Sequence, residues 1–327
     1  MYSTAYHRGD LKRSTFLVTG GAGFIGSHVV EYLLKHGADS VRVLDNLVTG
    51  SEANVKRFGG NKTYEFINGD ITDLHACNAA GKGVDFIIHM AALGSVPRSI
   101  VNPMATHQTN VDGFINVLLA AREQGVKRVV YASSSSVYGD NTDLPKKEGK
   151  TGNPLSPYAV SKMTDELYAN VFWRQYGLEV TGLRFFNVFG PRQSPEGPYA
   201  AVIPLFARAL NEGKSPSIFG DGRQVRDFTF VTNAVQGCIR AVFARDVCLG
   251  KVFNIAAGNR ISVLELFESM CDISGSSIAP KFLPPRKGDI RNSYADISAA
   301  REFLGYEPEI DFSGSLSRTM EWLNRLS

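Results

Sequence analysis

The sequence predicts an α/β fold with a Rossmann-type, doubly wound parallel sheet and a smaller C-terminal α/β substrate-binding lobe. Up to residue 187, short apolar runs alternate with longer segments of helical periodicity. A glycine-rich turn, TGGAGFIG, joins the first apolar run to the first helical segment. Past Asn187, proline and glycine become frequent and the elements become shorter. Strands that are separated by helices need crossover connections, and these produce a parallel sheet that is covered on both faces.

Each predicted strand is a short run of aliphatic, aromatic or β-branched residues. In chain order these runs are 15–19, 41–45, 63–68, 85–90, 128–133 and 179–187. The predicted helices are longer segments in which apolar residues recur every three or four positions. They are the segments 23–37, 103–124 and 156–176. The loops past residue 187 are rich enough to form a binding cleft beside the sheet.

The composition excludes several classes of function. The chain has 327 residues, of which 43% are hydrophobic, and this is enough for a large core and more than one lobe. The net charge of +3 is dispersed without a run of Lys and Arg, which argues against a nucleic-acid partner. The first residues are polar and no apolar stretch is long enough to cross a membrane, so we expect a cytoplasmic protein without a membrane partner.

The cysteines and histidines form no metal-binding or redox pattern. The six histidines contain no HExxH or similar ligand set, so the sequence predicts no metal site. The cysteines are widely spaced and form no CxxC pair, so we expect four reduced thiols. They are Cys77, Cys238, Cys248 and Cys271.

The glycine-rich turn predicts a dinucleotide site. Gly20, Gly23 and Gly26 form the pattern GxxGxxG between a predicted strand and a predicted helix. Such glycines allow a tight turn, a close approach of pyrophosphate and close packing of helix on strand, and the helix N-terminus attracts phosphate. Asp45 ends the second predicted strand, where a carboxylate binds the adenosine ribose and favours NAD over NADP. Asp70 follows the third strand and either meets the adenine edge or is a plain loop acid.

Next to such a site, SPYAVSK predicts a proton-transfer pair. Tyr158 and Lys162 are four residues apart and therefore lie one turn apart on one face of a helix. The positive charges of Lys162 and of the nicotinamide ring would favour the phenolate of Tyr158. Tyr158 could then take a proton from an alcohol while Lys162 holds the nicotinamide ribose.

A serine hydroxyl from YASSSSVYG is expected to assist this pair. The fifth predicted strand ends in this run, and strand ends on this side of the sheet face the cofactor crevice. The four candidates are Ser133, Ser134, Ser135 and Ser136. A turn or cap hydroxyl is the alternative for each of them, and we expect that role for Ser136.

The motifs TGGAGFIG, ASSSSVYGD, SPYAVSK and RFFNVFGPRQ together resemble those of the extended short-chain dehydrogenase/reductase family. The resemblance runs from about residue 14 to the C-terminus. The chain is most similar to the UDP-sugar 4-epimerases, and HMAALGSVPRSI and CNAAGKGVDF are typical of the UDP-N-acetylglucosamine branch. The resemblance implies an NAD-binding domain at 1–187, with a returning segment near 227–258, and a mainly UDP-sugar-binding lobe at 188–327.

The resemblance also implies roles for particular residues. The catalytic set would be Tyr158, Lys162 and Ser134, although which of Ser133–Ser135 is essential stays open. The implied cofactor-binding residues are Gly20, Gly23, Phe24, Ile25, Gly26, Asp45, Asn46, Gly50, Asp70, Ile71, Ala91, Ala92, Asn110, Ser133, Tyr158 and Lys162. The implied substrate-binding residues are Gly94, Ser95, Ser134, Ser135, Tyr158, Asn187, Ala201, Val202, Phe219, Arg226, Arg286 and Ser293. Among these, the two arginines fall where the family grips the diphosphate.

Three positions depart from the glucose-type epimerases. Gly94 stands where those enzymes carry a lysine, and Ser293 where they often carry a tyrosine. Both changes would enlarge the pocket enough for an N-acetyl group. Phe185 replaces a common tyrosine and removes one hydroxyl near the nicotinamide.

The expected function is therefore that of a UDP-N-acetylglucosamine 4-epimerase with tightly bound NAD. It would interconvert UDP-N-acetylglucosamine and UDP-N-acetylgalactosamine through a transient 4-keto sugar, and its preference over the non-acetylated sugars stays open. Alternatives are a UDP-glucuronate 4-epimerase, with Arg98 as the carboxylate partner, or another nucleotide-sugar epimerase or dehydratase. A silent NAD-binding protein is a third class, although it would usually lose the tyrosine or lysine. The helices near 103–124 and 156–176 carry apolar residues that could pair with a second subunit or only cover the sheet, and the resemblance implies a homodimer.

Overall fold

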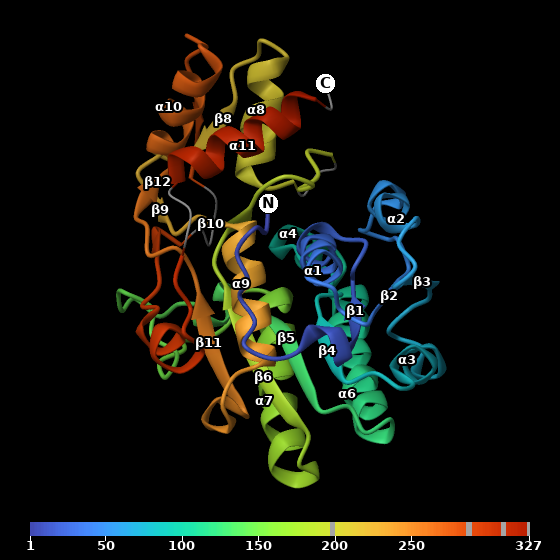
Figure 1. Cartoon of the computed structure of the whole chain (residues 1–327). Coiled ribbons are helices and arrows are strands. Elements are labelled where there is room, and N and C mark those ends of the chain that lie inside the picture. Colours follow the sequence, from blue (N-terminus) through green and yellow to red (C-terminus); the bar gives the residue numbers. More distant parts are fainter. Residues whose placement is uncertain (197–199, 286–289, 309–311, 326–327) are drawn as a thin grey trace.

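Seven parallel strands form the central sheet of the computed structural model, which describes residues 1–196, 200–285, 290–308 and 312–325 (Figure 1). From one edge to the other the strands are β3 (Tyr64–Asn68), β2 (Ser40–Asp45), β1 (Thr15–Thr19), β4 (Phe86–His89), β5 (Arg128–Ser134), β6 (Glu179–Phe185) and β11 (Lys251–Ile255). All neighbouring pairs are parallel. The strand order reverses between β1 and β4, which is where ligands bind in sheets of this kind. The predicted Rossmann-type fold is confirmed, and the six predicted strands agree with β1–β6 to within a few residues.

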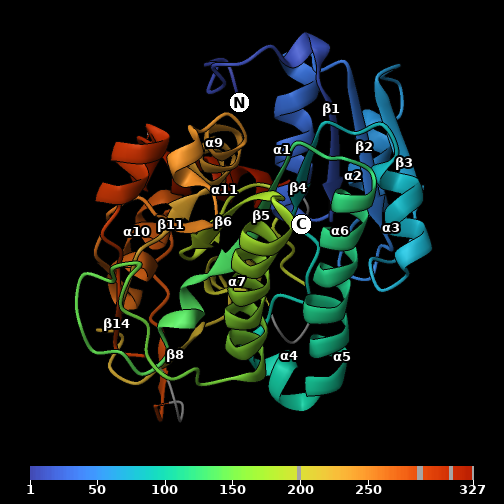
Figure 2. The same ribbon diagram turned by 90° about the horizontal axis from the view of Figure 1, so that it is seen from below.

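Helices cover both faces of this sheet because successive side chains of each strand point to opposite sides. Phe16 and Val18 belong to the core beneath α1 (Phe24–Lys35) and α9 (Val231–Val242), whereas Leu17 belongs to the core on the other face. The helices that cover this second face are α3 (Leu74–Gly81), α6 (Gly113–Glu123) and α7 (Pro157–Tyr176). Figure 2 shows α6 and α7 side by side along it.

Helix α7 begins where its sequence provides a cap. The side chain of Ser156 accepts a hydrogen bond from the amide of Ala159 at 3.1 Å, and Pro157 occupies the first turn. The helix ends at Gly177, which has a φ of 67° and provides the left-handed conformation of a C-cap. These caps place Tyr158 and Lys162 in the first two turns of a 20-residue helix.

The prediction of a single regular helix at 103–124 was wrong, because the segment is interrupted. The structure has α5 (Pro103–His107), one π-helical turn (Gln108–Asp112) and then α6. A separate helix, α4 (Val96–Val101), precedes them, and the side chain of Asn102 caps α5 through the amide of Ala105. The π turn adds a residue to the helix and carries Asn110, which is completely buried.

The C-terminal lobe lies above the carboxyl ends of the strands (Figure 1). Its helices are α8 (Val202–Asn211), α10 (Val263–Ser274) and α11 (Phe312–Asn324). Its short strands are β7 (Val188–Phe189), β8 (Ser217–Phe219), β9 (Val225–Arg226), β10 (Thr229–Phe230), β12 (Ile261–Ser262), β13 (Lys281–Leu283) and β14 (Asn292–Ser293). The lobe has its own core, in which Phe206, Phe267 and Leu316 are buried. Elsewhere the chain adds α2 (Glu52–Phe58) and 3₁₀ or π turns at Leu11–Arg13, Ser135–Tyr138, Asp246–Cys248 and Ala300–Leu304.

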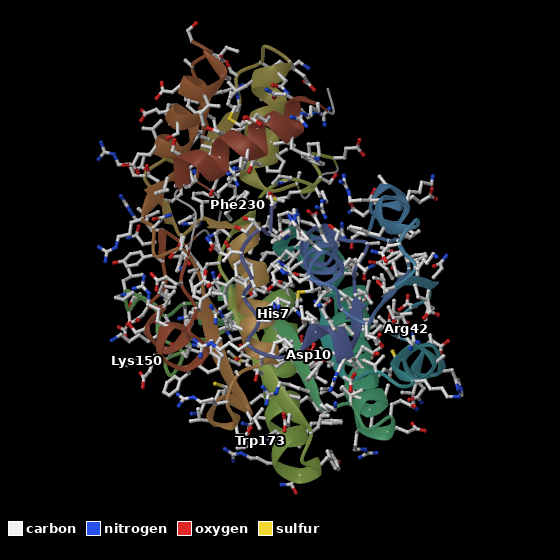
Figure 3. All side chains as sticks on the ribbon, viewed as in Figure 1. His7, Asp10, Arg42, Lys150, Trp173 and Phe230 are labelled. Atoms are coloured by element: carbon white, nitrogen blue, oxygen red, sulfur yellow. The ribbon has the colours of Figure 1, made fainter. Side chains whose placement is uncertain are left out.

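The segment before β1 packs against α1 through aromatic side chains. Figure 1 shows it descending between α9 and α1, and Figure 3 labels His7 and Asp10 along it. Tyr6 stacks on Tyr32 with 5.1 Å between the ring centroids, and the hydroxyl of Tyr32 accepts a hydrogen bond from the amide of Tyr6 at 2.6 Å. Within the described ranges, no helix has both the length and the apolar character needed to cross a membrane. The four cysteines are free thiols.

Candidate active site

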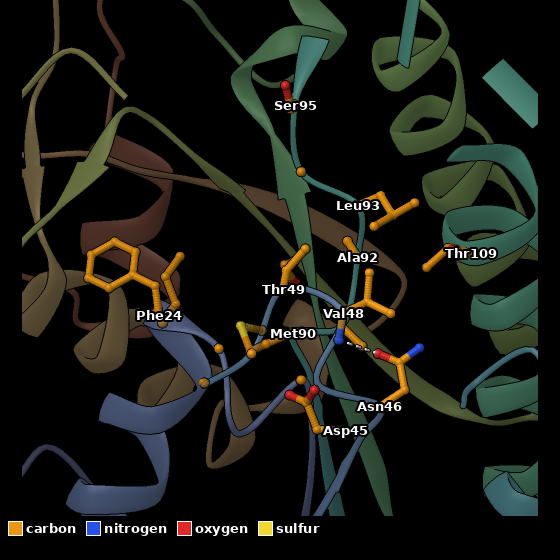
Figure 4. A pocket seen from close by; sticks show the side chains of 18 of the residues that line it. Phe24, Asp45, Asn46, Val48, Thr49, Met90, Ala92, Leu93, Ser95 and Thr109 are labelled. Atoms are coloured by element: carbon orange, nitrogen blue, oxygen red, sulfur yellow. Dashed lines mark hydrogen bonds between the residues drawn. The ribbon is translucent and has the colours of Figure 1, made fainter. Parts of the chain in front are cut away.

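A cavity of about 630 Å³ lies at the carboxyl ends of β1, β2 and β4. Figure 4 shows Phe24, Asp45 and Met90 facing the same opening from three different segments. Twelve of the residues implied for the cofactor line this cavity. They are Gly20, Gly23, Phe24, Ile25, Gly26, Asp45, Asn46, Gly50, Asp70, Ile71, Ala91 and Ala92. Gly94 and Ser95, which were implied for the substrate, also line it.

The glycines of the turn are required by close contacts. Gly20 has a φ of +69°, and a Cβ there would lie 2.5 Å from the amide nitrogen of Ala91. A Cβ on Gly26 would collide with the carbonyl oxygen of Gly20, so α1 can pack this closely on β1 only with glycine at that position. Gly23 is the N-cap of α1, and the first amide N–H groups of a helix have no partner within the helix. The turn therefore presents donors and a positive dipole end to the cavity.

Two carboxylates lie on the side of the cavity formed by β2 and β3. Asp45 accepts hydrogen bonds from the amides of Ala22, at 3.0 Å, and Leu47, at 2.8 Å, and burial raises its pKa despite these bonds. Asp70 accepts a 2.7 Å bond from the amide side chain of Asn46. Partial burial would raise the pKa of Asp70, but hydrogen bonds from Thr72 and Asn46 outweigh it and lower the pKa. Negative charge at the end of β2 suits ribose hydroxyls and repels a 2′-phosphate.

A second cavity, of about 760 Å³, is lined by residues of the C-terminal lobe together with Pro97 of α4. It shares Gln193, Ala200 and Ala201 with the first, so the two cavities adjoin. Five residues implied for the substrate line it, and these are Asn187, Ala201, Val202, Phe219 and Arg226. Ser293 lines neither cavity, because it is buried on β14 beside β9, and Arg286 lies outside the described residues.

Several lining residues were missed by sequence reasoning. In the first cavity they include Val48, Thr49, Met90, Leu93 and Thr109, and in the second Phe206, Gln224 and Phe228. Most are apolar and carry no local signal of ligand binding. Met90 and Leu93 could have been predicted from the sequence, because they flank Ala91 and Ala92, which were assigned to the cofactor.

Tyr158 and Lys162 lie on α7, next to the first cavity but not among its lining residues. Hydrogen bonds connect them to it: Asn110 accepts a bond from the amide of the lining residue Leu93 at 2.8 Å and donates to Ser161 at 3.0 Å. Ser161 in turn donates to the carbonyl oxygen of Tyr158 at 2.9 Å. In this structure Asn110 therefore fixes the position of α7 relative to the cavity wall.

Lys162 is buried and charged. Burial would lower its pKa, but the negative charge of Asp165, followed by Tyr158 and Glu166, outweighs burial and raises the pKa. Tyr158 and Lys162 both lie in the first two turns of α7, one helical turn apart as their spacing predicted.

The serines at the end of β5 and in the 3₁₀ turn that follows it have different environments. Ser133 donates to Glu166 Oε1 at 2.6 Å, and Ala132 beside it lines the first cavity. Ser136 was expected to be a turn or cap hydroxyl, and it lies in the 3₁₀ turn Ser135–Tyr138. The cap itself is Ser134, whose hydroxyl accepts a hydrogen bond from the amide of Ser136 at 3.1 Å. This bond occupies an acceptor site of Ser134 and leaves its hydroxyl proton available. The hydroxyl of Ser136 is buried and has no partner among the described residues.

Comparisons with known proteins agree with this geometry. Residues 16–256 match the model of the NAD dependent epimerase/dehydratase family. The chain is 39% identical to a putative UDP-glucose 4-epimerase of Methanocaldococcus jannaschii, over 94% of this chain and 97% of that protein. It is 34% identical to a UDP-glucuronate 4-epimerase of Thermodesulfobacterium geofontis, over 94% of this chain and 95% of that one. A similar solved structure is the UDP-N-acetylglucosamine 4-epimerase of Methanobrevibacter ruminantium M1 in complex with UDP-N-acetylmuramic acid, with a TM-score of 0.91 and 38% identity over 97% and 100% of the two chains.

Proposed function

The chain belongs to the NAD-dependent epimerase/dehydratase family, as a UDP-sugar 4-epimerase that uses NAD, and we propose that its main substrates are UDP-N-acetylglucosamine and UDP-N-acetylgalactosamine. The observation that carries this proposal is the pair of adjoining cavities. One has the glycine turn and the carboxylates that suit NAD, and the other lies in the lobe that carries Arg226. The first turns of α7, which carry Tyr158 and Lys162, lie beside the cavity with the glycine turn.

The glycine turn fits the cofactor because its packing excludes side chains at Gly20 and Gly26 and its helix end offers amide donors. The residues that would hold NAD are those of the first cavity, with Asp45 on the adenosine ribose and Lys162 near the nicotinamide ribose. NAD supplies the chemistry of accepting a hydride from carbon 4 of the sugar and returning it.

The protein residues move the proton in this proposal. Tyr158 takes the proton of the hydroxyl on carbon 4, and the hydroxyl of Ser134 bridges the sugar and the phenol. Lys162, which is buried and positively charged, stabilises the phenolate. The lobe holds the UDP while the keto sugar turns over, with Asn187 and Arg226 among the residues at the second cavity.

Space beside Gly94 supports the N-acetylated substrates. No heavy atom lies within 4 Å of the position that a Cβ would take on Gly94, and the residue lines the first cavity. Ser293 gives the size argument no such support, because it is buried and lines neither cavity. The proposal therefore depends on Gly94 for the room that an N-acetyl group needs.

A UDP-glucuronate 4-epimerase is the second candidate, because Arg98 lines the first cavity. A guanidinium there could pair with the carboxylate of a glucuronate. A UDP-glucuronate 4-epimerase is also among the relatives, at 34% identity.

We also propose a homodimer and a division of the chain. Exposed apolar side chains lie on three neighbouring helices. They are Ile100 and Val101 on α4, Met104 on α5, and Leu167 and Val171 on α7. Covering them would remove apolar surface from water. The cofactor domain would comprise 1–187 with the returning segment near 227–258, which contains α9 and β11, and 188–327 would mainly form the sugar-nucleotide lobe.

A substrate panel tests the proposal. The purified protein is incubated with UDP-N-acetylglucosamine, UDP-glucose and UDP-glucuronate in turn, without added NAD, and the anomeric protons are followed by NMR. Formation of UDP-N-acetylgalactosamine at the highest kcat/KM supports the proposal. Faster conversion of UDP-glucuronate favours the second candidate, and conversion of none of the three would reject both.

A further inference from the structure

A buried ion pair joins Lys162, one member of the proposed reacting pair, to Asp165 three residues further along α7. Lys162 Nζ is 3.0 Å from Asp165 Oδ2, and the two side chains are 2% and 1% exposed. The other oxygen of this carboxylate, Oδ1, is buried and has no hydrogen-bond partner within the described ranges. Removing a carboxylate from water is costly unless hydrogen bonds satisfy it. Packing alone would favour an apolar side chain here, so the charge of Asp165 requires another explanation.

The neighbouring acid cannot replace Asp165 as the partner of Lys162. Glu166 is held by two bonds from Arg184, at 2.8 and 2.7 Å, and by the hydroxyl of Ser133 at 2.6 Å. These bonds direct its carboxylate toward β5 and β6. Its influence on Lys162 is smaller than that of Asp165 or Tyr158.

The other titratable groups around the pair are neutral. Nδ1 of His89, on β4, lies 2.7 Å from the hydroxyl of Thr19. Burial lowers the pKa of His89 to about 3, and the positive charge of Lys162 adds a smaller effect in the same direction. Burial also raises the pKa of Tyr131, on β5. The negative charges of Glu166 and Asp165 add to this rise, and the positive charge of Arg184 opposes it. The charge that balances Lys162 at contact distance, among the described residues, is therefore that of Asp165.

We infer that Asp165 is a positioning residue: its carboxylate holds the ammonium of Lys162 in place and sets the pH range in which Tyr158 and Lys162 work together. The inference rests on the proposed function, because it takes these two side chains as the reacting pair. Asp165 itself touches neither substrate nor cofactor in this account and acts through Lys162.

The direction of the effect follows from electrostatics. A negative charge beside Lys162 favours the protonated form of Lys162. Replacing the carboxylate with a neutral amide removes this effect, so Lys162 should release its proton at lower pH. The basic limb of the pH–rate profile reports a group that must keep its proton. The basic limb should therefore move to lower pH.

The protonation of Asp165 adds a second signature. Burial raises the pKa of Asp165 to about 6, since it outweighs the lowering by Lys162, and Glu166 adds to the rise. Below that pH the wild-type side chain becomes neutral, as Asn is at every pH. The profiles of wild type and Asp165→Asn should thus differ above about pH 6 and converge below it.

The test compares Asp165→Asn with the wild type and with Asp246→Asn, a control that removes one carboxylate whose side chain is 93% exposed. The readout is kcat/KM against pH, where we expect the basic limb of Asp165→Asn to move down by about one pH unit. Asp246→Asn should match the wild type.

Coincident pH profiles for Asp165→Asn and wild type would overturn the inference while leaving the epimerase assignment intact. A wild type without epimerase activity would instead reject the proposed function, and with it the inference that rests on it. If Asp165→Asn does not fold, Asp165→Ser takes its place. Loss of folding in both would overturn the inference, because it would make Asp165 a requirement of the fold.

Discussion

The hydroxyl of Tyr2 lies 2.8 Å from Nδ1 of His28, and both side chains are buried. Nε2 of the same ring lies 2.8 Å from the carbonyl oxygen of Pro191. Burial and the nearby charge of Arg192 lower the pKa of His28 well below its usual range, so the ring is neutral. Because a carbonyl can only accept, Nε2 carries the proton and Nδ1 accepts from Tyr2. The first residues of the chain thereby hold the loop that leads to Gln193, which lines both cavities.

Tyr2→Phe should therefore weaken both stability and substrate binding. The variant leaves Nδ1 of His28 buried without a donor, which should lower the free energy of unfolding by about 1–3 kcal/mol. The loosened loop should also raise KM for the UDP-sugar. Urea unfolding and steady-state kinetics measure the two effects, and Tyr168→Phe, on the surface of α7, serves as the control. An unchanged midpoint and KM would show that this hydrogen bond does not hold the loop.

Gly26→Ala should disturb the contact between α1 and the glycine turn. The added methyl would collide with the carbonyl oxygen of Gly20. Overpacking of this kind should lower the free energy of unfolding by about 1–3 kcal/mol, and the purified protein should retain less NAD. Gly60→Ala is a matched control, because no heavy atom lies within 4 Å of a Cβ at that position. Full NAD content and wild-type stability in Gly26→Ala would contradict the role given to the turn.

His89 should make the protein less stable as the pH falls. Burial, with a smaller effect of Lys162, lowers the pKa of His89 to about 3, so the unfolded chain binds this proton more readily than the folded one. The stability contributed by neutral His89 is complete above about pH 6.5 and declines as the pH falls toward 3. Between pH 7 and pH 5, the wild type should lose about 2 kcal/mol relative to His89→Asn. Because buried acids titrate in the same window, the difference between the two proteins is the quantity to compare, and parallel pH dependences would contradict the prediction.

The sheet and the glycine turn could be predicted because their signals are local. Each strand of the sheet up to β6 is a short run rich in aliphatic, aromatic and β-branched residues. Gly20, Gly23 and Gly26 fall within seven consecutive residues, so their pattern can be read directly from the sequence. The same is true of α7, whose cap, first proline and final glycine are all visible in the sequence.

Features that depend on distant contacts could not be predicted in this way. The bond between His28 and Pro191 joins positions 163 residues apart, and no pattern near Tyr2 indicates that it is buried. The π turn around Asn110 depends on Leu93 and Ser161, which come from other segments. Ser134 caps the turn after β5. The sequence could not identify it, because four consecutive serines have the same local signal.

The most direct test of the account is the rate at which Tyr158→Phe forms UDP-N-acetylgalactosamine from UDP-N-acetylglucosamine. Both proteins are purified and assayed without added NAD, and the anomeric protons are followed by NMR. We predict that the wild type converts the substrate and that Tyr158→Phe is slower by about 10²-fold or more, with its NAD still bound. A Tyr158→Phe protein that turns over at nearly the wild-type rate would show that another group removes the proton.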